Sequence, residues 1–369
     1  MKVLFISHYD SLYGANKSLV SLVDQLRKDE TTFCHIIIQK EGEISAFLKS
    51  KNIPFSIIPF RNEVGHKVNY IKGLIYLLYN FYLCFRNYRL LNSQNFDLIH
   101  TNSSISFFGC YLSYLLKIPH VFHIREFLSL DYKLYYLLGN QYSNYWIRKS
   151  AEVISISKAI QSFRYKSSKV IYNGIIDENE QIYREIKDGD LITASIIGHI
   201  NPGKNQLEAI KLIEKLGINF NIKLNIVGSG DEDYKLFLEN YVKEKELGDS
   251  INFLGYQNDV KPFFLVSDLV LMCSLNEGLG RVTVEAMSYG AIVLGFNNGG
   301  TSEIIKDGYN GFLYNNFEEL VSKTENCLSN QDLFNKIRAN AMKNAKENFS
   351  IQSYSSKIMQ VYKDILYEN

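Results

Sequence analysis

Two glutamates eight positions apart, Glu277 and Glu285, stand on either side of the start of an expected helix over residues 281–290. Carboxylates accept hydrogen bonds from paired hydroxyl groups, so this pair could bracket a ligand that carries a sugar ring at each end. The turn 278–280 between them is rich in glycine. Unpaired backbone N–H groups and the helix dipole favour a bound phosphate at such a helix start. The stretch therefore predicts a ligand that contains both sugar hydroxyls and phosphate.

A lysine earlier in the chain suits the same ligand. Lys204 stands between an expected strand over 191–198 and an expected helix over 207–216. An ammonium group at a helix start would neutralise part of the charge of a diphosphate.

Polar residues also follow the expected strands of the first half of the chain. Gly14 and Ala15 come after the expected strand 2–7 and lead into an expected helix over 17–27. Because ligands lie off the carboxyl ends of strands in open α/β sheets, we expect ligand contacts from four further residues, which are His100, Asn102, His123 and Arg125. A lone histidine is otherwise most often a satisfied structural residue, and a plain turn remains the alternative for Gly14.

Short apolar strands alternate with helical segments along the chain, which is typical of α/β folds with parallel sheets. Residues 68–91 are aromatic or aliphatic almost all round, so this helix is either buried in the core or lies on a membrane. Residues 128–147 repeat this composition. The longest strongly apolar run, 73–85, is too short to span a bilayer.

The segment after residue 273 resembles the carboxyl-terminal signature of retaining glycosyltransferases of family 4. That signature is Glu-x7-Glu with a glycine pair inside, then a helix, then Gly-Gly before Ser-Glu. The alternative is an ordinary βαβ unit with surface glutamates. The matching positions are Glu277, Gly278, Gly280, Glu285, Ala286, Gly290, Gly299, Gly300, Ser302 and Glu303.

The resemblance implies the GT-B fold, an α/β architecture of two Rossmann-like, doubly wound parallel-sheet domains that face a cleft. Residues 1–176 would bind the acceptor and residues 177–350 the nucleotide sugar. Residues 351–369 would form a helix that packs back on the first domain. The Asn-Gly turn at 173–174 and a polar linker over 177–190 support the first boundary.

The resemblance also implies roles for individual residues. Lys204 and His199, which replaces the family's arginine, would face the diphosphate, Glu277 the transferred sugar and Glu285 the ribose. His123 would lie near the transferred sugar and the acceptor. The remaining expected donor contacts are Gly14, Ala15, Gly198, Gly228, Tyr256, Gly278, Leu279 and Gly280.

The net charge of +1 hides an asymmetry between the two halves. Residues 1–175 hold 21 of the 40 lysines and arginines but only 11 of the 39 acidic residues. A basic first half fits an anionic membrane or a phosphate-bearing acceptor, although two solvated faces with no partner are equally compatible. The five scattered cysteines have no metal-type spacing, and the amino terminus reads as a strand, so we expect a cytoplasmic protein. Association with the inner face of the membrane, through the basic first half, stays open.

The resemblance, together with these residues, implies a retaining, metal-independent glycosyltransferase that needs no cofactor and no nucleic acid. It would transfer a hexose or N-acetylhexosamine from a nucleotide sugar, with UDP favoured, to a glycan or lipid-linked acceptor in bacterial surface polysaccharide synthesis. Two alternatives stay open, which are a nucleotide-sugar 2-epimerase of the same fold and a non-catalytic partner subunit of another glycosyltransferase.

Overall fold

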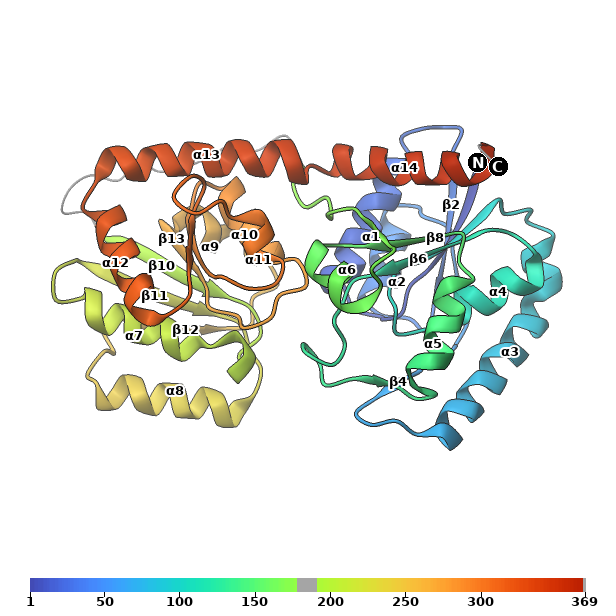
Figure 1. The fold of residues 1–369 in the computed structure, drawn as a ribbon, viewed down its shortest axis with the longest axis horizontal. Helices are drawn as coiled ribbons and strands as arrows, with labels where there is room; N and C mark the ends of the chain where they lie inside the picture. The colour runs from blue at the N-terminus through green and yellow to red at the C-terminus, as the bar shows by residue number, and fades with distance from the viewer. Residues whose placement is uncertain (178–190, 368–369) are drawn as a thin grey trace. The chain divides into compact units, whose positions relative to one another are not determined.

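The computed structural model describes residues 1–177 and 191–367 (Figure 1). The chain divides into two compact units, Met1–Gly174 with Ile351–Asn369, and Ile175–Ser350. Almost all of the linker expected over 177–190 lies outside the described residues.

The first unit is built on a seven-stranded sheet in the order β3-β2-β1-β5-β6-β8-β9, in which every neighbouring pair is parallel. In β1 the four residues Val3 to Ile6 are at most 1% exposed, as expected for a strand covered on both faces. The strands are β1 (Lys2–Ile6), β2 (Phe33–Ile38), β3 (Phe55–Ile57), β5 (Leu98–Thr101), β6 (His120–Ile124), β8 (Glu152–Ser155) and β9 (Lys169–Val170).

Helices from both ends of the chain share a core with this sheet. The helix α1 (Gly14–Leu26) contributes Leu19 and Val23, and α14 (Ile351–Tyr367) contributes Ile358 and Tyr362. The other elements are β4 (Val64–Gly65), which pairs antiparallel with β7 (Tyr135–Tyr136), and the helices α2 (Glu43–Ser50), α3 (Tyr70–Asn92), α4 (Phe108–Leu116), α5 (Gly139–Arg148) and α6 (Lys158–Arg164).

The long apolar helix α3 is not buried on every side, so the core interpretation of residues 68–91 is only half right. Gly73, Asn80 and Cys84 lie on its buried face, whereas Leu74 and Leu78 are exposed. Figure 1 shows α3 at the outer edge of its unit. Of residues 128–147, only those from Gly139 onward belong to a helix.

The second unit contains a six-stranded parallel sheet in the order β12-β11-β10-β13-β14-β15. The strands are β10 (Ile192–Ile197), β11 (Ile222–Val227), β12 (Ile251–Gly255), β13 (Leu269–Met272), β14 (Ile292–Phe296) and β15 (Phe312–Tyr314). The helices are the 3₁₀ turn η1 (Pro202–Lys204), α7 (Gln206–Leu216), α8 (Glu232–Glu244), α9 (Lys261–Val266), α10 (Arg281–Ser288), α11 (Thr301–Ile304), α12 (Phe317–Leu328) and α13 (Gln331–Phe349).

The strand order reverses direction at β10, whose neighbours are β11 on one side and β13 on the other. In doubly wound sheets, ligands bind at the carboxyl ends of the strands, at the point where the strand order reverses. In this sheet that point lies between β10 and β13. Each unit is thus a Rossmann-like, doubly wound α/β domain, as predicted. The reversal in the second unit is where the loops that carry Lys204 and Glu277 begin.

Candidate functional site

The loops after β10 and β13 bring Lys204 and Glu277 together, 73 positions apart in the chain. The Lys204 ammonium donates a hydrogen bond to the Glu277 carboxylate. Lys204 ends the turn η1, which Asn201 caps by accepting from the Lys204 N–H at 3.0 Å. The side chains of Lys204 and Glu277 are 33% and 14% exposed. An ammonium has three donors, so Lys204 can bind a further anion while it keeps Glu277.

Backbone hydrogen bonds fix the loops around this ion pair. The Leu275 N–H donates to the Gly203 carbonyl at 3.1 Å, and the Gly300 N–H donates to the Glu277 carbonyl at 2.7 Å. A Cβ on Gly300 would lie 2.4 Å from Cα of Leu279, so only glycine fits at this approach. The loops after β10, β13 and β14 are therefore held as one assembly.

The helix α10 starts in the same assembly. Gly280 precedes it with a φ of 85°, a conformation that favours glycine. The Arg281 guanidinium donates to Oε1 of Glu285 at 2.9 Å, and both side chains are partly exposed. Leu279 is buried, so this residue offers its backbone rather than its side chain. At the other end, Gly290 has a φ of 82° and follows the cap residue Tyr289, which confirms the predicted glycine stop.

A second group of glycines lies along the same edge, after β10, β11 and β12. A Cβ on Gly228 would lie 1.9 Å from the Gly198 carbonyl oxygen, so the two loops touch backbone to backbone. The Gly228 N–H donates to the Gly255 carbonyl at 2.8 Å. Next to these loops, His199 and Tyr256 are exposed. The structure thus gathers Gly198, His199, Gly228 and Tyr256 at the carboxyl edge of the sheet, while their contacts with a donor stay a prediction.

Two further threonines at this edge escaped the sequence analysis. The hydroxyls of Thr283 and Thr301 are buried and have no hydrogen-bond partner among the described residues. The hydroxyl oxygen of each threonine would lie 3.2 Å from a Cβ atom built on Gly280. Threonine inside a helical pattern gives no signal that its hydroxyl points at a turn, so only the coordinates reveal this pair.

Asp231 and Asp233 form an Asp-x-Asp pair, a pattern that can hold a divalent metal and that bears on the predicted metal independence. Asp231 caps α8 by accepting from the Tyr234 N–H at 3.0 Å, which is a structural role. A second such pair, Asp188 and Asp190, falls outside the described residues. Within residues 1–177 and 191–367, no three His, Cys, Asp or Glu side chains gather as metal ligands would.

In the first unit, the predicted contact residues form a buried network with α14. Nδ1 of His100 lies 2.5 Å from the Tyr362 hydroxyl, and the Arg125 guanidinium donates to Asn173 Oδ1 at 2.6 Å and to the Tyr354 hydroxyl at 3.1 Å. The polar atoms of His100 and Arg125 therefore hold the last helix onto the sheet, and the contact of both residues with a ligand stays a prediction.

The side chain of Asn102 also forms hydrogen bonds within the first unit. Its carbonyl and side-chain oxygens accept from Nε of Arg125, and its amide donates to the Ala15 carbonyl at 3.1 Å. Gly14 and Ala15 form the first turn of α1. Asn102 therefore links the end of β5 to the start of α1, while its contact with a ligand stays a prediction.

Two histidines of this unit keep an unused ring nitrogen. His123 lies 3.1 Å from Nε2 of His100 through its own Nδ1, but its Nε2 is buried without a partner among the described residues. The same holds for Nδ1 of His8 at the end of β1, a residue that the sequence analysis did not single out. Burial, and next the Arg125 charge, lower the pKa of His8 to about 3 and that of His123 well below its usual range. Both rings are neutral at pH 7. Because the Arg125 guanidinium donates to Nδ1 of His123 at 3.3 Å, the proton of the His123 ring is on Nε2, which can donate one hydrogen bond.

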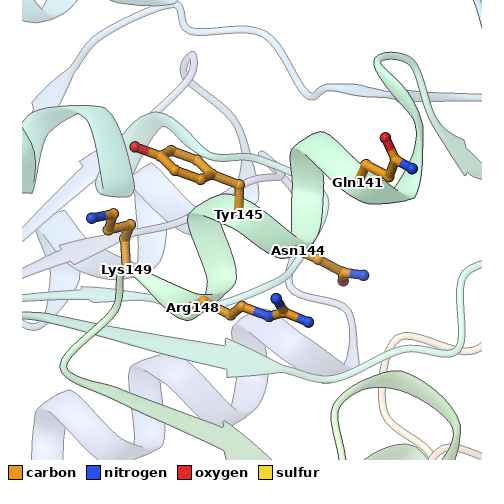
Figure 2. Close-up of a pocket in the computed structure, with 5 residues that line it drawn as sticks. All are labelled: Gln141, Asn144, Tyr145, Arg148 and Lys149. Carbon is orange, nitrogen blue, oxygen red and sulfur yellow. The ribbon is translucent and has the colours of Figure 1, made fainter.

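A hollow of about 540 Å³ lies on the outside of α5 and is unrelated to the predicted site (Figure 2). One helix and its cap residue line it, and no predicted site residue is among the five. These residues are Gln141, Asn144, Tyr145, Arg148 and Lys149.

Comparison with known proteins gives two family matches that follow one another along the chain. The model for Glycosyltransferase Family 4 matches residues 14–179, and the model for Glycosyl transferases group 1 matches residues 177–348. In the part of the chain that the structure describes, no helix is long and apolar enough to cross a bilayer.

Relatives of full length carry the same description. An uncharacterized glycosyltransferase of Methanocaldococcus jannaschii is 29% identical over 99% of both chains. The UDP-Gal:alpha-D-GlcNAc-diphosphoundecaprenol alpha-1,3-galactosyltransferase of Escherichia coli is 24% identical over 99% of this chain and 97% of its own. HepE of Anabaena, crystallised in complex with UDP, has the same fold, with a TM-score of 0.80 at 22% identity over 99% of this chain and all of its own.

Proposed function

The chain belongs to glycosyltransferase family 4, and we propose that it is a retaining enzyme that uses a UDP-sugar donor. It would transfer a hexose or N-acetylhexosamine to a glycan or lipid-linked acceptor in bacterial surface polysaccharide synthesis. The observation that carries the proposal is the Lys204–Glu277 ion pair at the strand-order reversal of the second unit.

The diphosphate of the donor would bind beside Lys204 and the start of α10. The Lys204 ammonium has donors beyond the one that Glu277 uses, and the first N–H groups of α10 add a field that favours anions. Donors fixed before the reaction stabilise the charge that develops on the leaving diphosphate. Because these groups already neutralise part of that charge, we propose that no metal ion is needed. His199 would add one hydrogen bond, which is less than the forked contact of an arginine.

The two carboxylates would hold the ends of the donor. Glu285, already oriented by Arg281 at 2.9 Å, would accept from the ribose hydroxyls. Glu277 would accept from hydroxyls of the transferred sugar. The contacts between Gly300 and Leu279 and between Gly228 and Gly198 keep these loops in place, so the site does not have to be ordered by the donor.

Transfer with retention follows a front-face course in this proposal. The acceptor hydroxyl oxygen forms a bond to the anomeric carbon while the bond from that carbon to the diphosphate oxygen breaks. The proton of the hydroxyl passes to the departing phosphate oxygen, which leaves UDP as the other product. His123 would lie near the sugar and the acceptor, and its neutral ring with Nε2 unused is compatible with a hydrogen bond to a hydroxyl.

A thermal-shift screen of UDP-, GDP- and ADP-sugars tests the donor assignment. A ligand that binds only the folded state raises its melting temperature, by an amount that grows with its concentration over Kd. We expect a shift with UDP-sugars, and no shift with any nucleotide sugar would refute the proposal. Formation of the C2-epimer from the donor alone, with no acceptor present, would indicate the epimerase instead.

Removal of divalent cations tests the metal assignment. We expect the transfer rate in excess EDTA to match the rate in added Mg²⁺, because the diphosphate is neutralised by Lys204 and backbone donors. Loss of transfer in EDTA, restored by Mg²⁺ or Mn²⁺, would contradict this part of the proposal.

A further inference from the structure

The exposed face of α3 in the first unit is apolar along most of its length. Six large residues on this face are between 51% and 77% exposed. Their spacing of three or four positions places them in one stripe along the helix. We refer to this set as the α3 stripe, which consists of Ile71, Leu74, Ile75, Leu78, Tyr82 and Phe85.

The α3 stripe is not needed to attach the helix to its unit. The opposite face holds the buried residues Gly73, Asn80, Leu83, Cys84 and Leu91. Asn80 there exchanges hydrogen bonds of 2.8 and 3.0 Å with the backbone of Arg61. Because the opposite face already attaches the helix to its unit, the α3 stripe is exposed apolar surface that the fold does not require. A contiguous exposed apolar patch of this kind marks an interaction site.

Charge around the stripe has one sign. No acidic residue occurs between positions 64 and 96, whereas Lys67, Lys72, Arg86 and Arg89 all lie there and are exposed. The neighbouring helices α4 and α5 also contain no acidic residue. Arg148 and Lys149, drawn in Figure 2, end α5. Exposed helices of globular proteins usually mix both charges, so this region is complementary to an extended anionic surface.

We propose that α3 lies in the headgroup region of an anionic bilayer, with the α3 stripe inserted among the acyl chains. No described helix is fit to span a membrane, but a helix with an apolar face flanked by lysine and arginine binds in the plane of the interface. The exposed tyrosines Tyr70 and Tyr82 suit the same depth, where aromatic rings with a polar end are enriched. This inference deepens the proposed function, since it would place the first unit at a surface where a lipid-linked acceptor resides.

Vesicle co-sedimentation of the full chain tests the proposal. We expect binding to vesicles of phosphatidylcholine with 30–40% phosphatidylglycerol, much weaker binding to pure phosphatidylcholine, and weakening by 0.5 M NaCl. Leu78→Glu should lower the partition coefficient at least tenfold, because one inserted leucine is lost and a carboxylate is added. Arg86→Gln and Arg89→Gln should each lower it about fivefold.

A matched substitution on the second unit provides the control. Leu236 on α8 is 57% exposed, close to the 62% of Leu78. Leu236→Glu should leave vesicle binding unchanged. Both variants should keep the wild-type melting temperature and the wild-type thermal shift with UDP, so failure of membrane binding is separable from failure of the donor assignment.

Three results would overturn the proposal. They are wild-type protein that does not bind anionic vesicles, equal binding by Leu78→Glu and wild type, or equal loss in Leu78→Glu and Leu236→Glu. A wild-type dimer in solution that Leu78→Glu converts to monomer, without vesicle binding, would show that the α3 stripe is a protein interface instead.

Discussion

The carboxyl edges of the two sheets carry similar polar residues but use them differently. In the second unit, Lys204 and Glu277 are paired yet partly exposed. In the first unit, His100 and Arg125 are at most 6% exposed and bond mainly to Asn102, Asn173 and the α14 tyrosines. A charged residue after a parallel strand is therefore not by itself a ligand contact.

The two edges differ in how many side-chain donors remain available to a ligand. The Arg125 guanidinium forms hydrogen bonds with four residues, which are Asn102, His123, Asn173 and Tyr354. Lys204 donates to one carboxylate from a loop edge, where a ligand can reach the same ammonium. We accordingly expect substitutions at the second edge to change binding and catalysis, and substitutions at the first edge to change stability.

The largest expected effect is that of Lys204→Ala. Removing one preorganised donor from a developing charge lowers turnover by about 10²- to 10³-fold, and steady-state transfer from the best UDP-sugar measures it. Lys211→Ala, at an exposed position of α7, is the matched control and should stay within about twofold of wild type. Wild-type turnover in Lys204→Ala would remove the basis of the phosphate role.

Arg125→Leu should instead destabilise the first unit, by about 2–3 kcal/mol in the free energy of unfolding. The substitution leaves Asn173 Oδ1 and the Tyr354 hydroxyl buried without this donor. Denaturant unfolding followed by circular dichroism measures the change, and Arg148→Leu on exposed α5 should alter it by less than about 0.5 kcal/mol. Equal stability of Arg125→Leu and wild type would show that the network does not hold α14.

Glu285→Ala should weaken UDP binding about tenfold, since a hydrogen bond to a charged group contributes about 1.5–3 kcal/mol and Arg281 can offset part of the loss. Calorimetric titration with UDP gives the affinity. Glu318→Ala on α12, at an exposed position, should bind like wild type. An unchanged Kd in Glu285→Ala would rule out the ribose assignment but not the phosphate site.

The smallest effect is a pH dependence of stability that arises in the first unit. Burial lowers the pKa of His8 to about 3, below the ordinary value of 6.5. Below pH 6.5 His8 is protonated in the unfolded chain, whereas in the folded chain it stays neutral down to about pH 3. The free energy of unfolding therefore decreases as the pH falls from 6.5 to about 3.

The contribution of His8 to this slope is at most about 1.4 kcal/mol per pH unit. Urea midpoints between pH 7 and pH 5 measure the slope, which His8→Gln should flatten. His66→Gln, at an exposed position, should not change it. A slope that is identical in His8→Gln and wild type would contradict the buried, neutral state of His8.

Local patterns were enough to predict the second edge. Glycines at turns, as at Gly290, and residues after parallel strands, as at Lys204 and Glu277, follow rules of short range. The parallel order of β10 and β13 then brings the two loops together. The Lys204–Glu277 ion pair joins residues 73 positions apart, but each of the two residues lies in a local sequence pattern that predicts its position.

The first edge depended on contacts without such signals. His100 meets Tyr362 across 262 positions, and Arg125 meets Tyr354 across 229. No spacing rule links a strand end to a tyrosine on the last helix. In α3 the composition is apolar all round, which favours burial, and only the packing reveals that one face has no cover. Helices α4 and α8 are likewise not among the elements expected from the sequence.

A crystal structure of the enzyme with UDP tests the central claim most directly. The account predicts the diphosphate beside the Lys204 ammonium, with a phosphate oxygen at about 2.7–2.9 Å from Nζ and further oxygens facing the N–H groups at the start of α10. UDP bound elsewhere on the second unit, with Lys204 still paired only to Glu277, would contradict it.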